Sequence, residues 1–275
     1  MSDTSVQIQW SAQTDTGRFR KNNEDAFLAL AIDSMEVKRL GKEGASSCDI
    51  YDFVFAVSDG MGGAKAGEFA SQIATDRISR VFPQSFRSAA SGMSYGFKDM
   101  MESLFDDIHK DLGELGKSYD ECSGMGATLS LGWIGPKWLY FGHVGDSRIY
   151  HIPKDTSAGI QQISHDHTHT GWLERQGKLN EREARNHPRR NSLQQTLGGR
   201  TQYLDPHIGA IQHEPGDIFL FCSDGLTDGI WNRRLEDLIR NRDAESIEGL
   251  AKHLVDFSVN ASGKDNTTAI VVYIN

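Results

Sequence analysis

The sequence is poor in cysteine and proline, and it contains no long apolar run. Its three cysteines, Cys48, Cys122 and Cys222, lie far apart, which excludes a disulfide framework and a CxxC metal motif. Cys222 lies inside an apolar run and is expected to be a reduced core residue. Only 6 of 275 residues are proline, 38% are hydrophobic and 24% are charged, as in an ordinary folded globular protein.

Features of membrane and nucleic-acid proteins are also missing. No uncharged apolar stretch is long enough to span a bilayer, and the N-terminal MSDTSVQIQW lacks the basic and apolar segments of a signal peptide. The net charge is −9 with histidine neutral, whereas proteins that bind nucleic acid or anionic membranes are usually basic. We therefore expect a cytoplasmic protein with no nucleic-acid partner and no membrane partner.

Short apolar runs alternate with turns along the chain, and no repeat or linker divides it, so we expect one domain over residues 1–275. Strands are predicted at 6–12, 26–32, 53–57, 124–134, 138–143, 149–152, 160–163, 208–211, 218–222 and 267–274. Helices are predicted at 67–81 (ended by Pro83), 95–115, 235–239 and 246–259. The Met and Phe residues of 95–115 recur at helical spacing, which favours a core face over a cofactor site. Residues 33–50 are predicted to be a loop or a long hairpin tip.

One predicted strand leads into a carboxylate flanked by glycines. Residues 53–57 run into Ser58-Asp59-Gly60, and two more glycines follow Met61. A buried strand that stops at a tight turn would present Asp59 to a hard cation, and the glycines would allow close backbone approach. Asp-Gly is also one of the commonest turn signals, so Asp59 taken alone favours an ordinary turn.

Three further aspartates, Asp146, Asp224 and Asp265, also lie where an apolar strand meets a turn. Strands in two stacked layers can bring such ends to one edge of a core, where the carboxylates would repel one another unless cations held them. Aspartates without cysteine or adjacent histidine ligands favour Mg²⁺ or Mn²⁺ over zinc. Two such ions can turn a bridging water into hydroxide and clamp a phosphoryl group, for which Arg20 offers a planar cation. The spacing is thus compatible with a binuclear metal hydrolase.

Residues 165–199 form the one long segment with little to bury, and they carry many arginines. We expect a surface excursion, either a small subdomain or a lid. The segment begins with His165-Asp166-His167-Thr168-His169. On a strand the three histidine rings would share one face and could bind zinc, although polar, exposed segments are also an ordinary place for histidine.

Seven motifs, in order along nearly the whole chain, resemble the metal-dependent serine/threonine protein phosphatases of type 2C, and the bacterial branch most closely. The motifs are TDTGRFRKNNEDAF (14–27), VFAVSDGMGG (54–63), GATLSL (126–131), HVGDSRIY (143–150), the segment 165–199, FLFCSDGLTD (219–228) and KDNTTAIVV (264–272). The resemblance implies an α+β fold: a β-sandwich of two antiparallel sheets flanked by helices, in the layer order α-β-β-α. Residues 166–199 would be the family's flap, which lies beside the cleft and touches the phosphoprotein.

The resemblance also implies which residues hold the metal ions. Asp59 would bridge two core ions, Mn²⁺ or Mg²⁺, and the Gly60 carbonyl would bind one of them. Asp224 and Asp265 would hold the other. Asp146 would serve, together with Asp224, the third ion that many bacterial members bind.

Three residues of the N-terminal motif complete the implied site. Glu24 would assist at the metal nearer to Gly60, and Asp25 would hold metal-bound water. Arg20 would bind the phosphate. The implied reaction is hydrolysis of phosphoserine and phosphothreonine in proteins by direct attack of a metal-bridging hydroxide, without a phosphoenzyme. The partners would be phosphorylated proteins, namely a cognate Ser/Thr kinase or its substrates, and the enzyme is expected to be a monomer.

Two departures from the family pattern leave alternatives open. Many bacterial members carry a histidine directly after DGMGG, and animal members carry one just after the Asp-Gly, whereas this chain has Ala64 and Met61 there. No general acid is therefore visible, and a metal-bound water is the expected proton donor. A catalytically silent phosphoprotein-binding member is one alternative, and a two-metal nucleotide phosphohydrolase is another. The loop 33–50 is longer than a minimal family member needs. It is either a segment that binds a partner or a tolerated insertion.

Overall fold

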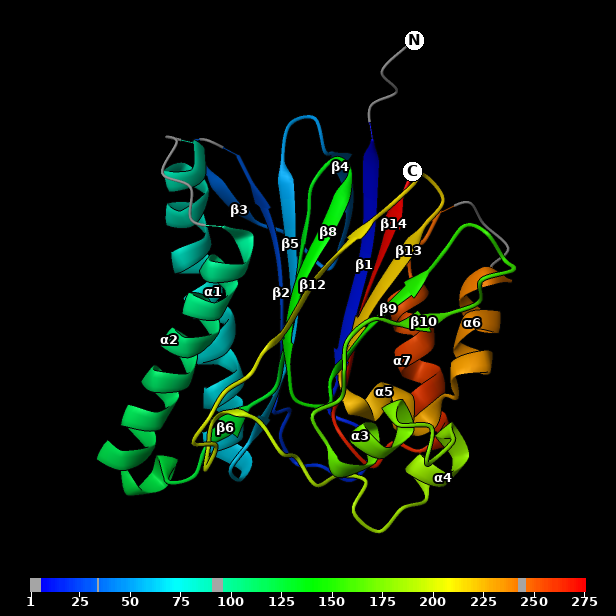
Figure 1. The fold of residues 1–275 in the computed structure, drawn as a ribbon. Coiled ribbons are helices and arrows are strands. Elements are labelled where there is room, and N and C mark those ends of the chain that lie inside the picture. Colours follow the sequence, from blue (N-terminus) through cyan, green and yellow to red (C-terminus); the bar gives the residue numbers. More distant parts are fainter. Residues whose placement is uncertain (1–5, 34, 91–95, 242–245) are drawn as a thin grey trace.

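Two antiparallel β-sheets packed face to face form the centre of the molecule (Figure 1). The structure is a computed structural model that describes residues 6–33, 35–90, 96–241 and 246–275. One sheet contains β1 (Gln7–Asp15), β4 (Glu43–Ser47), β9 (Arg148–Ile152), β10 (Gln161–Gln162), β13 (Ile218–Cys222) and β14 (Thr267–Ile274), in the order β10-β9-β13-β14-β1-β4.

The second sheet contains β2 (Asp25–Ile32), β3 (Val37–Arg39), β5 (Asp52–Met61), β6 (Gly126–Ala127), β7 (Leu129–Ile134), β8 (Trp138–Val144), β11 (Leu197–Gly198) and β12 (His207–Gln212). Its main path is β11-β6-β5-β7-β8-β12, with β2 paired to β5 and β3 paired to β2. The helices are α1 (Ala64–Ala90), α2 (Phe97–Ser118), α3 (His169–Arg175), α4 (Glu181–Arg185), α5 (Asp224–Gly229), α6 (Asn232–Arg240) and α7 (Leu250–Ala261), with a 3₁₀ turn at Asp120–Cys122.

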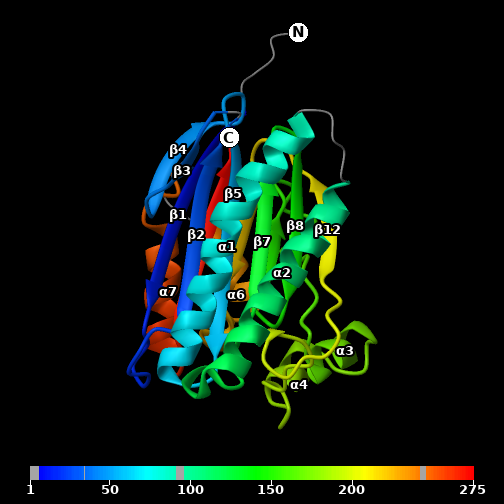
Figure 2. The ribbon, with the colours of Figure 1, turned by 90° about the vertical axis from the view of Figure 1, so that its left-hand side faces the viewer.

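The helices cover the outer faces of the two sheets, which gives the layer order α-β-β-α. Helices α1 and α2 lie over the second sheet, and α5, α6 and α7 lie over the first (Figures 1 and 2). Within the ranges that the structure describes, no helix combines the length and apolarity that a bilayer crossing requires. The two antiparallel sheets and their flanking helices confirm the predicted fold class, an α+β sandwich in the layer order α-β-β-α.

The central strands are apolar on both faces because each face meets another layer. In β5, Phe53, Phe55 and Val57 face the other sheet. The alternate residues Val54 and Ala56 face α1 and α2. The same alternation in β13 and β14 explains why these runs read as continuous apolar segments rather than as alternating ones.

Several element boundaries differ from those predicted. Helix α1 does not end at Pro83 but continues to Ala90. Proline removes only one backbone hydrogen bond, which a long helix that packs on the sheet through Ala70, Ala74 and Ile78 tolerates. Helix α2 begins at Phe97, and Tyr95 of the predicted helix lies outside the described residues. Helix α7 begins only at Leu250, after Gly249 in the left-handed conformation with φ 73°.

The segment 33–50 is more than a loop. It contributes β3, which pairs with β2, and β4, which pairs with β1, so it adds an edge strand to each sheet. The short strand predicted at 160–163 shrinks to β10, and the closing strand 267–274 agrees with the prediction at both ends. Cys222 is buried in the core, as predicted, and Cys48 and Cys122 are also free thiols.

Candidate active site

An open cleft of about 520 Å³ gathers most of the predicted site residues. Seven of the eight line it, namely Arg20, Glu24, Asp59, Gly60, Asp146, Asp224 and Asp265. The eighth, Asp25, is buried, with 8% of its surface exposed. Residues that are far apart in the sequence therefore meet at one edge of the sandwich.

The sequence predicted that Asp59 lies at a turn, but the structure places it inside β5, which continues to Met61. Strand β2 runs alongside, and the pairing register places Asp25 directly opposite Asp59. Two carboxylates opposite each other on neighbouring strands repel and destabilise the sheet locally. The backbone of Asp59 is fixed by Thr128, whose Oγ1 accepts from the Asp59 N–H at 3.0 Å.

Close packing around Gly60 brings β5, α1 and Glu24 together. The Gly60 N–H donates to the Glu24 carbonyl at 3.1 Å. A Cβ on Gly60 would lie 1.9 Å from the Gly67 carbonyl oxygen in α1, and a Cβ on Gly67 would lie 2.6 Å from a Glu24 carboxylate oxygen. Only glycine fits at these two positions, so the predicted Gly60 ligand lies beside the Glu24 side chain.

Asp25 joins both sheets at the site. The hydroxyls of Ser223, which follows β13, and Thr268, in β14, each donate to Asp25 Oδ2 at 2.7 Å. Asp25 Oδ1 is buried and has no hydrogen-bond partner in the described structure. Burial raises the pKa of Asp25 to about 6, although the two hydroxyls stabilise its charged form.

Asp224 is the first residue of α5 and is separated from β13 by Ser223 alone, so the predicted turn is in fact a helix start. Its Oδ1 atom is also buried without a hydrogen-bond partner in the described structure. Burial, and then repulsion from Asp146, raise the pKa of Asp224 well above its ordinary value. Burial likewise raises the pKa of Asp146 to about 7, with repulsion from Asp166 adding to it.

Arg20 lines the cleft beside these acids. Its Nη2 atom lies 2.6 Å from Asp265 Oδ2, so the predicted phosphate ligand and a predicted metal ligand are in contact. Asp59 gains no comparable partner. Burial and the charges of Asp25, Asp224, Asp146 and Asp265 raise its pKa well above its ordinary value.

The donor set suits a hard divalent cation. No group of three or more His, Cys, Asp or Glu side chains in the described ranges is arranged so that it could hold a metal ion as it stands. However, the buried oxygens of Asp25 and Asp224 lack partners, and Asp59 is surrounded by like charges. Carboxylate oxygens are the ligands that Mg²⁺ and Mn²⁺ prefer, and their charge would offset this repulsion. The residues present therefore fit divalent cations.

Asn266 is a structural residue of the site that the sequence reasoning missed. Its Nδ2 donates to the carbonyls of Thr16 and Asn22 at 2.9 Å each, and its Oδ1 accepts from the Glu24 N–H at 2.8 Å. It therefore holds the loop between β1 and β2, which carries Arg20, against the turn that carries Asp265. Its position beside Asp265 in the motif KDNTT was the available signal.

Histidine takes no part in lining the cleft among the described residues. The three histidines of the possible zinc motif also diverge. His165 stacks on His207 with ring centroids 3.7 Å apart, His167 lies against His143 at 5.3 Å, and His169 lies 6.3 Å from Trp172. The zinc interpretation is therefore not supported in the described chain.

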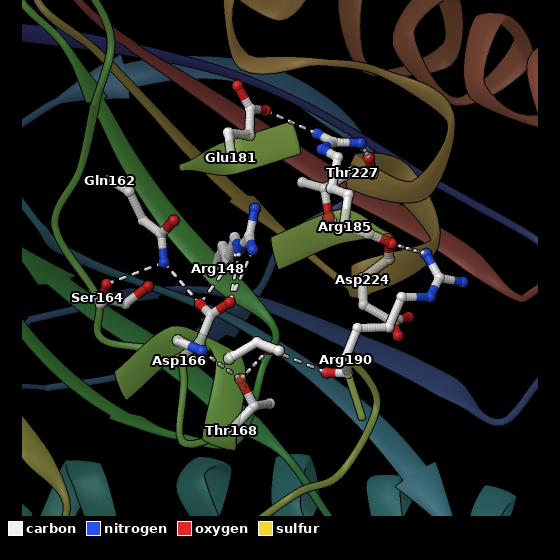
Figure 3. A network of polar contacts seen from close by, with 12 residues as sticks. Arg148, Gln162, Ser164, Asp166, Thr168, Glu181, Arg185, Arg190, Asp224 and Thr227 are labelled. Atoms are coloured by element: carbon white, nitrogen blue, oxygen red, sulfur yellow. Dashed lines mark hydrogen bonds and ion pairs between the residues drawn. The ribbon is translucent and has the colours of Figure 1, made fainter. Parts of the chain in front are cut away.

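The segment 166–199 lies over the edge of the site. Ion pairs and hydrogen bonds of Arg148, Arg185 and Arg190 hold it in this position (Figure 3). The half-buried Arg148 makes a forked ion pair with the buried Asp166, with 2.7 Å between Arg148 Nη2 and Asp166 Oδ2. Arg190 pairs with Asp228 of α5 at 3.0 Å. A second, smaller hollow between this segment and α5 shares Asp146 and Asp224 with the cleft.

Arg185 of α4 makes the most extensive of these contacts. Its guanidinium donates to the carbonyls of Thr227 and Ile230 at the end of α5, the second at 2.8 Å, and to Glu181 Oε1 at 3.0 Å. It also lies over the ring of Trp231, 4.5 Å from the centroid. Because Asp224 begins α5, the segment holds the far end of the helix that presents this carboxylate.

The fold and the cleft together define a four-layer α-β-β-α protein with a carboxylate-lined site suited to divalent cations. The sequence profile of protein phosphatase 2C matches residues 42–258. The chain belongs to the protein phosphatase 2C family.

Individual relatives agree in length and in fold. Protein phosphatase PhpP of Streptococcus pneumoniae is 29% identical over 269 residues, which are 98% of each chain. The solved serine/threonine phosphatase of S. agalactiae is 26% identical with a TM-score of 0.80, over 98% of this chain and 100% of that one. The catalytic domain of the phosphatase PstP, solved in complex with 2 manganese ions, has a TM-score of 0.70 at 23% identity, over 98% and 99% of the two chains.

Proposed function

We propose that this chain is a metal-dependent protein serine/threonine phosphatase that hydrolyses phosphoserine and phosphothreonine in proteins. The observation that carries the proposal is the convergence of Asp59, Asp224 and Asp265 on one cleft beside Arg20, in a chain of the protein phosphatase 2C family. The metal dependence is that of the family. The phosphoproteins would be a cognate Ser/Thr kinase or its substrates, and the enzyme would act as a monomer.

Divalent ions, when bound, supply an acidified water nucleophile and neutralise charge on the phosphoryl group. Asp59, Asp224 and Asp265 would hold two core ions together with the Gly60 carbonyl. Glu24 would support the ion nearer to Gly60. These donors would take Mn²⁺ or Mg²⁺, since all are hard oxygens.

The remaining residues bind and orient the substrate and water. The Arg20 guanidinium would bind the phosphate through its planar fork. Asp25, held by Ser223 and Thr268, would orient water with its free Oδ1 atom. Asp146 would share a third ion with Asp224. Because no described residue lining the cleft is a histidine, the leaving alkoxide would take its proton from water.

The segment 166–199 would be a flap within a single phosphatase domain over residues 1–275. Its residues Asn191 and Leu193 line the cleft, where they would contact the phosphoprotein next to its phosphorylated residue. The cytoplasmic location stays a prediction.

The deciding experiment is hydrolysis of phosphothreonine and phosphoserine peptides by the full chain, with phosphate release measured at increasing Mn²⁺. We expect turnover that needs Mn²⁺ or Mg²⁺ and stops in excess chelator. Full activity in chelator would reject the metal mechanism. Binding of phosphopeptides with no release of phosphate would instead show that the chain is a catalytically inactive protein that binds phosphoproteins.

A further inference from the structure

Large apolar side chains lie on the rim of an otherwise charged cleft. Phe19 is 73% exposed and Met61 is 39% exposed, and both line the cleft together with the half-buried Leu193. Single exposed apolar side chains are normal on a protein surface, but several around one binding cleft indicate contact with a ligand. The three come from different parts of the chain: the β1–β2 loop, the end of β5 and the segment 166–199.

The backbone that presents Phe19 is held by hydrogen bonds on both sides. Phe19 lies in a loop held by Asn266, which binds the carbonyls of Thr16 and Asn22, and by the Arg18 N–H, which donates to the Gly263 carbonyl at 2.8 Å. The rim is thus organised before a ligand arrives, which lowers the entropy cost of binding.

Met61 is held in a similar way. It is the last residue of β5 and pairs with Gly126 of β6. Met61 lines the cleft and is 39% exposed, so at this position the chain offers an apolar surface rather than a proton donor. A methionine thioether is flexible and adapts to apolar side chains of different shape.

We propose that Phe19, Met61 and Leu193 form an apolar rim that selects phosphoproteins with an aliphatic residue next to the phosphorylated serine or threonine. The inference rests on the proposed function, since it takes the phosphate to lie at Arg20. Phe19 directly precedes Arg20, and neighbouring residues of a substrate are about 3.8 Å apart, so the rim contacts a residue one or two positions from the phosphorylated one. Burying an aliphatic side chain there removes apolar surface of both molecules from water.

The test uses the full chain with Mn²⁺ and phosphothreonine peptides that differ only at the residues flanking the phosphothreonine, which are leucine, serine or glutamate. We expect kcat/KM to be about 5–10-fold higher for the leucine peptide than for the serine peptide. In the double variant Phe19→Ser, Met61→Ser, the ratio should fall to within about twofold. The ratio is measured within one preparation, so a change in folding or metal loading cancels.

The matched control is Met35→Ser, since Met35 is 82% exposed but does not line the cleft. This variant should keep the preference of the unmodified chain. Equal hydrolysis of the three peptides, a preference for glutamate through Lys21, or a leucine preference that survives in the double variant would each overturn the inference and leave the proposed function intact. Failure to hydrolyse any of the peptides would refute the proposed function itself.

Discussion

Asp59 and Asp224 lie among other carboxylates, and this arrangement costs free energy of folding at neutral pH. Burial and like charges raise the pKa of both groups, so the folded state binds protons more tightly than the unfolded state does. Their contribution to the free energy of unfolding therefore becomes more favourable as the pH falls and less favourable as these groups ionise. Active sites of this kind are often less stable than the rest of a protein because their function requires the unfavourable arrangement.

Asp59→Asn should abolish metal-dependent turnover and yet stabilise the metal-free fold, because it removes a charge that its neighbours repel. We expect the thermal midpoint in chelator to rise by about 2–5 °C. Added Mn²⁺ should raise the midpoint of the unmodified chain strongly and that of the variant little. Differential scanning calorimetry with and without Mn²⁺ measures both effects, and a variant that is less stable than the unmodified chain in chelator would contradict the electrostatic account.

Arg20→Ala should weaken substrate binding more than it slows the chemical step. The guanidinium offers a forked donor to phosphate, and its loss should raise KM about tenfold while lowering kcat less. Arg20→Lys keeps the charge but not the fork, so it should give an intermediate KM. Steady-state kinetics on a phosphopeptide measure both constants. An unchanged KM in Arg20→Ala would remove the assigned role.

At the scale of elements, the segment 166–199 and α5 act on the site together. Arg185 holds the carbonyls of Thr227 and Ile230 at one end of α5, and Asp224 lies at the other end (Figure 3). Hydrogen bonds from a charged donor are stronger than those between neutral groups. Arg185 therefore holds the segment together with Arg190, which pairs with Asp228 of α5, and Arg148, which pairs with Asp166.

Arg185→Ala should loosen the segment from α5 and leave only the Arg190–Asp228 ion pair of the described contacts between them. Each lost charged hydrogen bond is worth about 1.5–3 kcal/mol, and the buried carbonyls would lose their partners. We expect faster proteolytic cleavage within 176–199 and a kcat/KM for phosphopeptides lower by about tenfold. The control is Arg182→Ala, an exposed position on the same short helix. Equal proteolysis and equal kinetics in the two variants would show that the Arg185 contacts do not hold the segment.

At the scale of the whole molecule, buried and half-buried histidines contribute to the response to acid. Burial, the largest cause, lowers the pKa of His167 and His207 to about 4, and it lowers that of His143 well below its ordinary value. The unfolded chain takes up these protons near pH 6.5. The stability due to the neutral rings is thus complete above about pH 6.5 and is lost as the pH falls toward 4. The acidic groups Asp25 and Asp146 act in the opposite sense.

His207→Gln should make stability less dependent on pH between about 6.5 and 4, because one group that binds a proton only on unfolding is gone. His253→Gln, at an exposed position on α7, serves as the control and should keep the slope of the unmodified chain. Urea unfolding at several pH values gives the free energy of unfolding for each protein. Parallel pH profiles for all three would show that His207 contributes nothing to the acid response.

The amino-acid sequence by itself predicted buried strands and a set of acidic groups, and the resemblance of its motifs to protein phosphatase 2C implied the layered fold, which the structure confirms. Runs that are apolar on both faces specify strands buried between two layers, and aspartates at strand junctions specify an acidic edge that suits divalent cations. These features are local in the chain, so composition and spacing reveal them. The family resemblance of the N-terminal motif is what predicts Glu24 and Asp25 as members of the site beside Arg20.

Only the tertiary structure decided how these residues meet. The pairing of Asp25 opposite Asp59, the contact between Arg20 and Asp265, and the Arg185 contacts to α5 each join segments that are far apart in the sequence. The continuation of β5 to Met61 also depends on a distant segment, because Met61 pairs with Gly126 of β6. Local propensity is weak compared with packing between layers, which is why the sequence identified the groups but not their contacts.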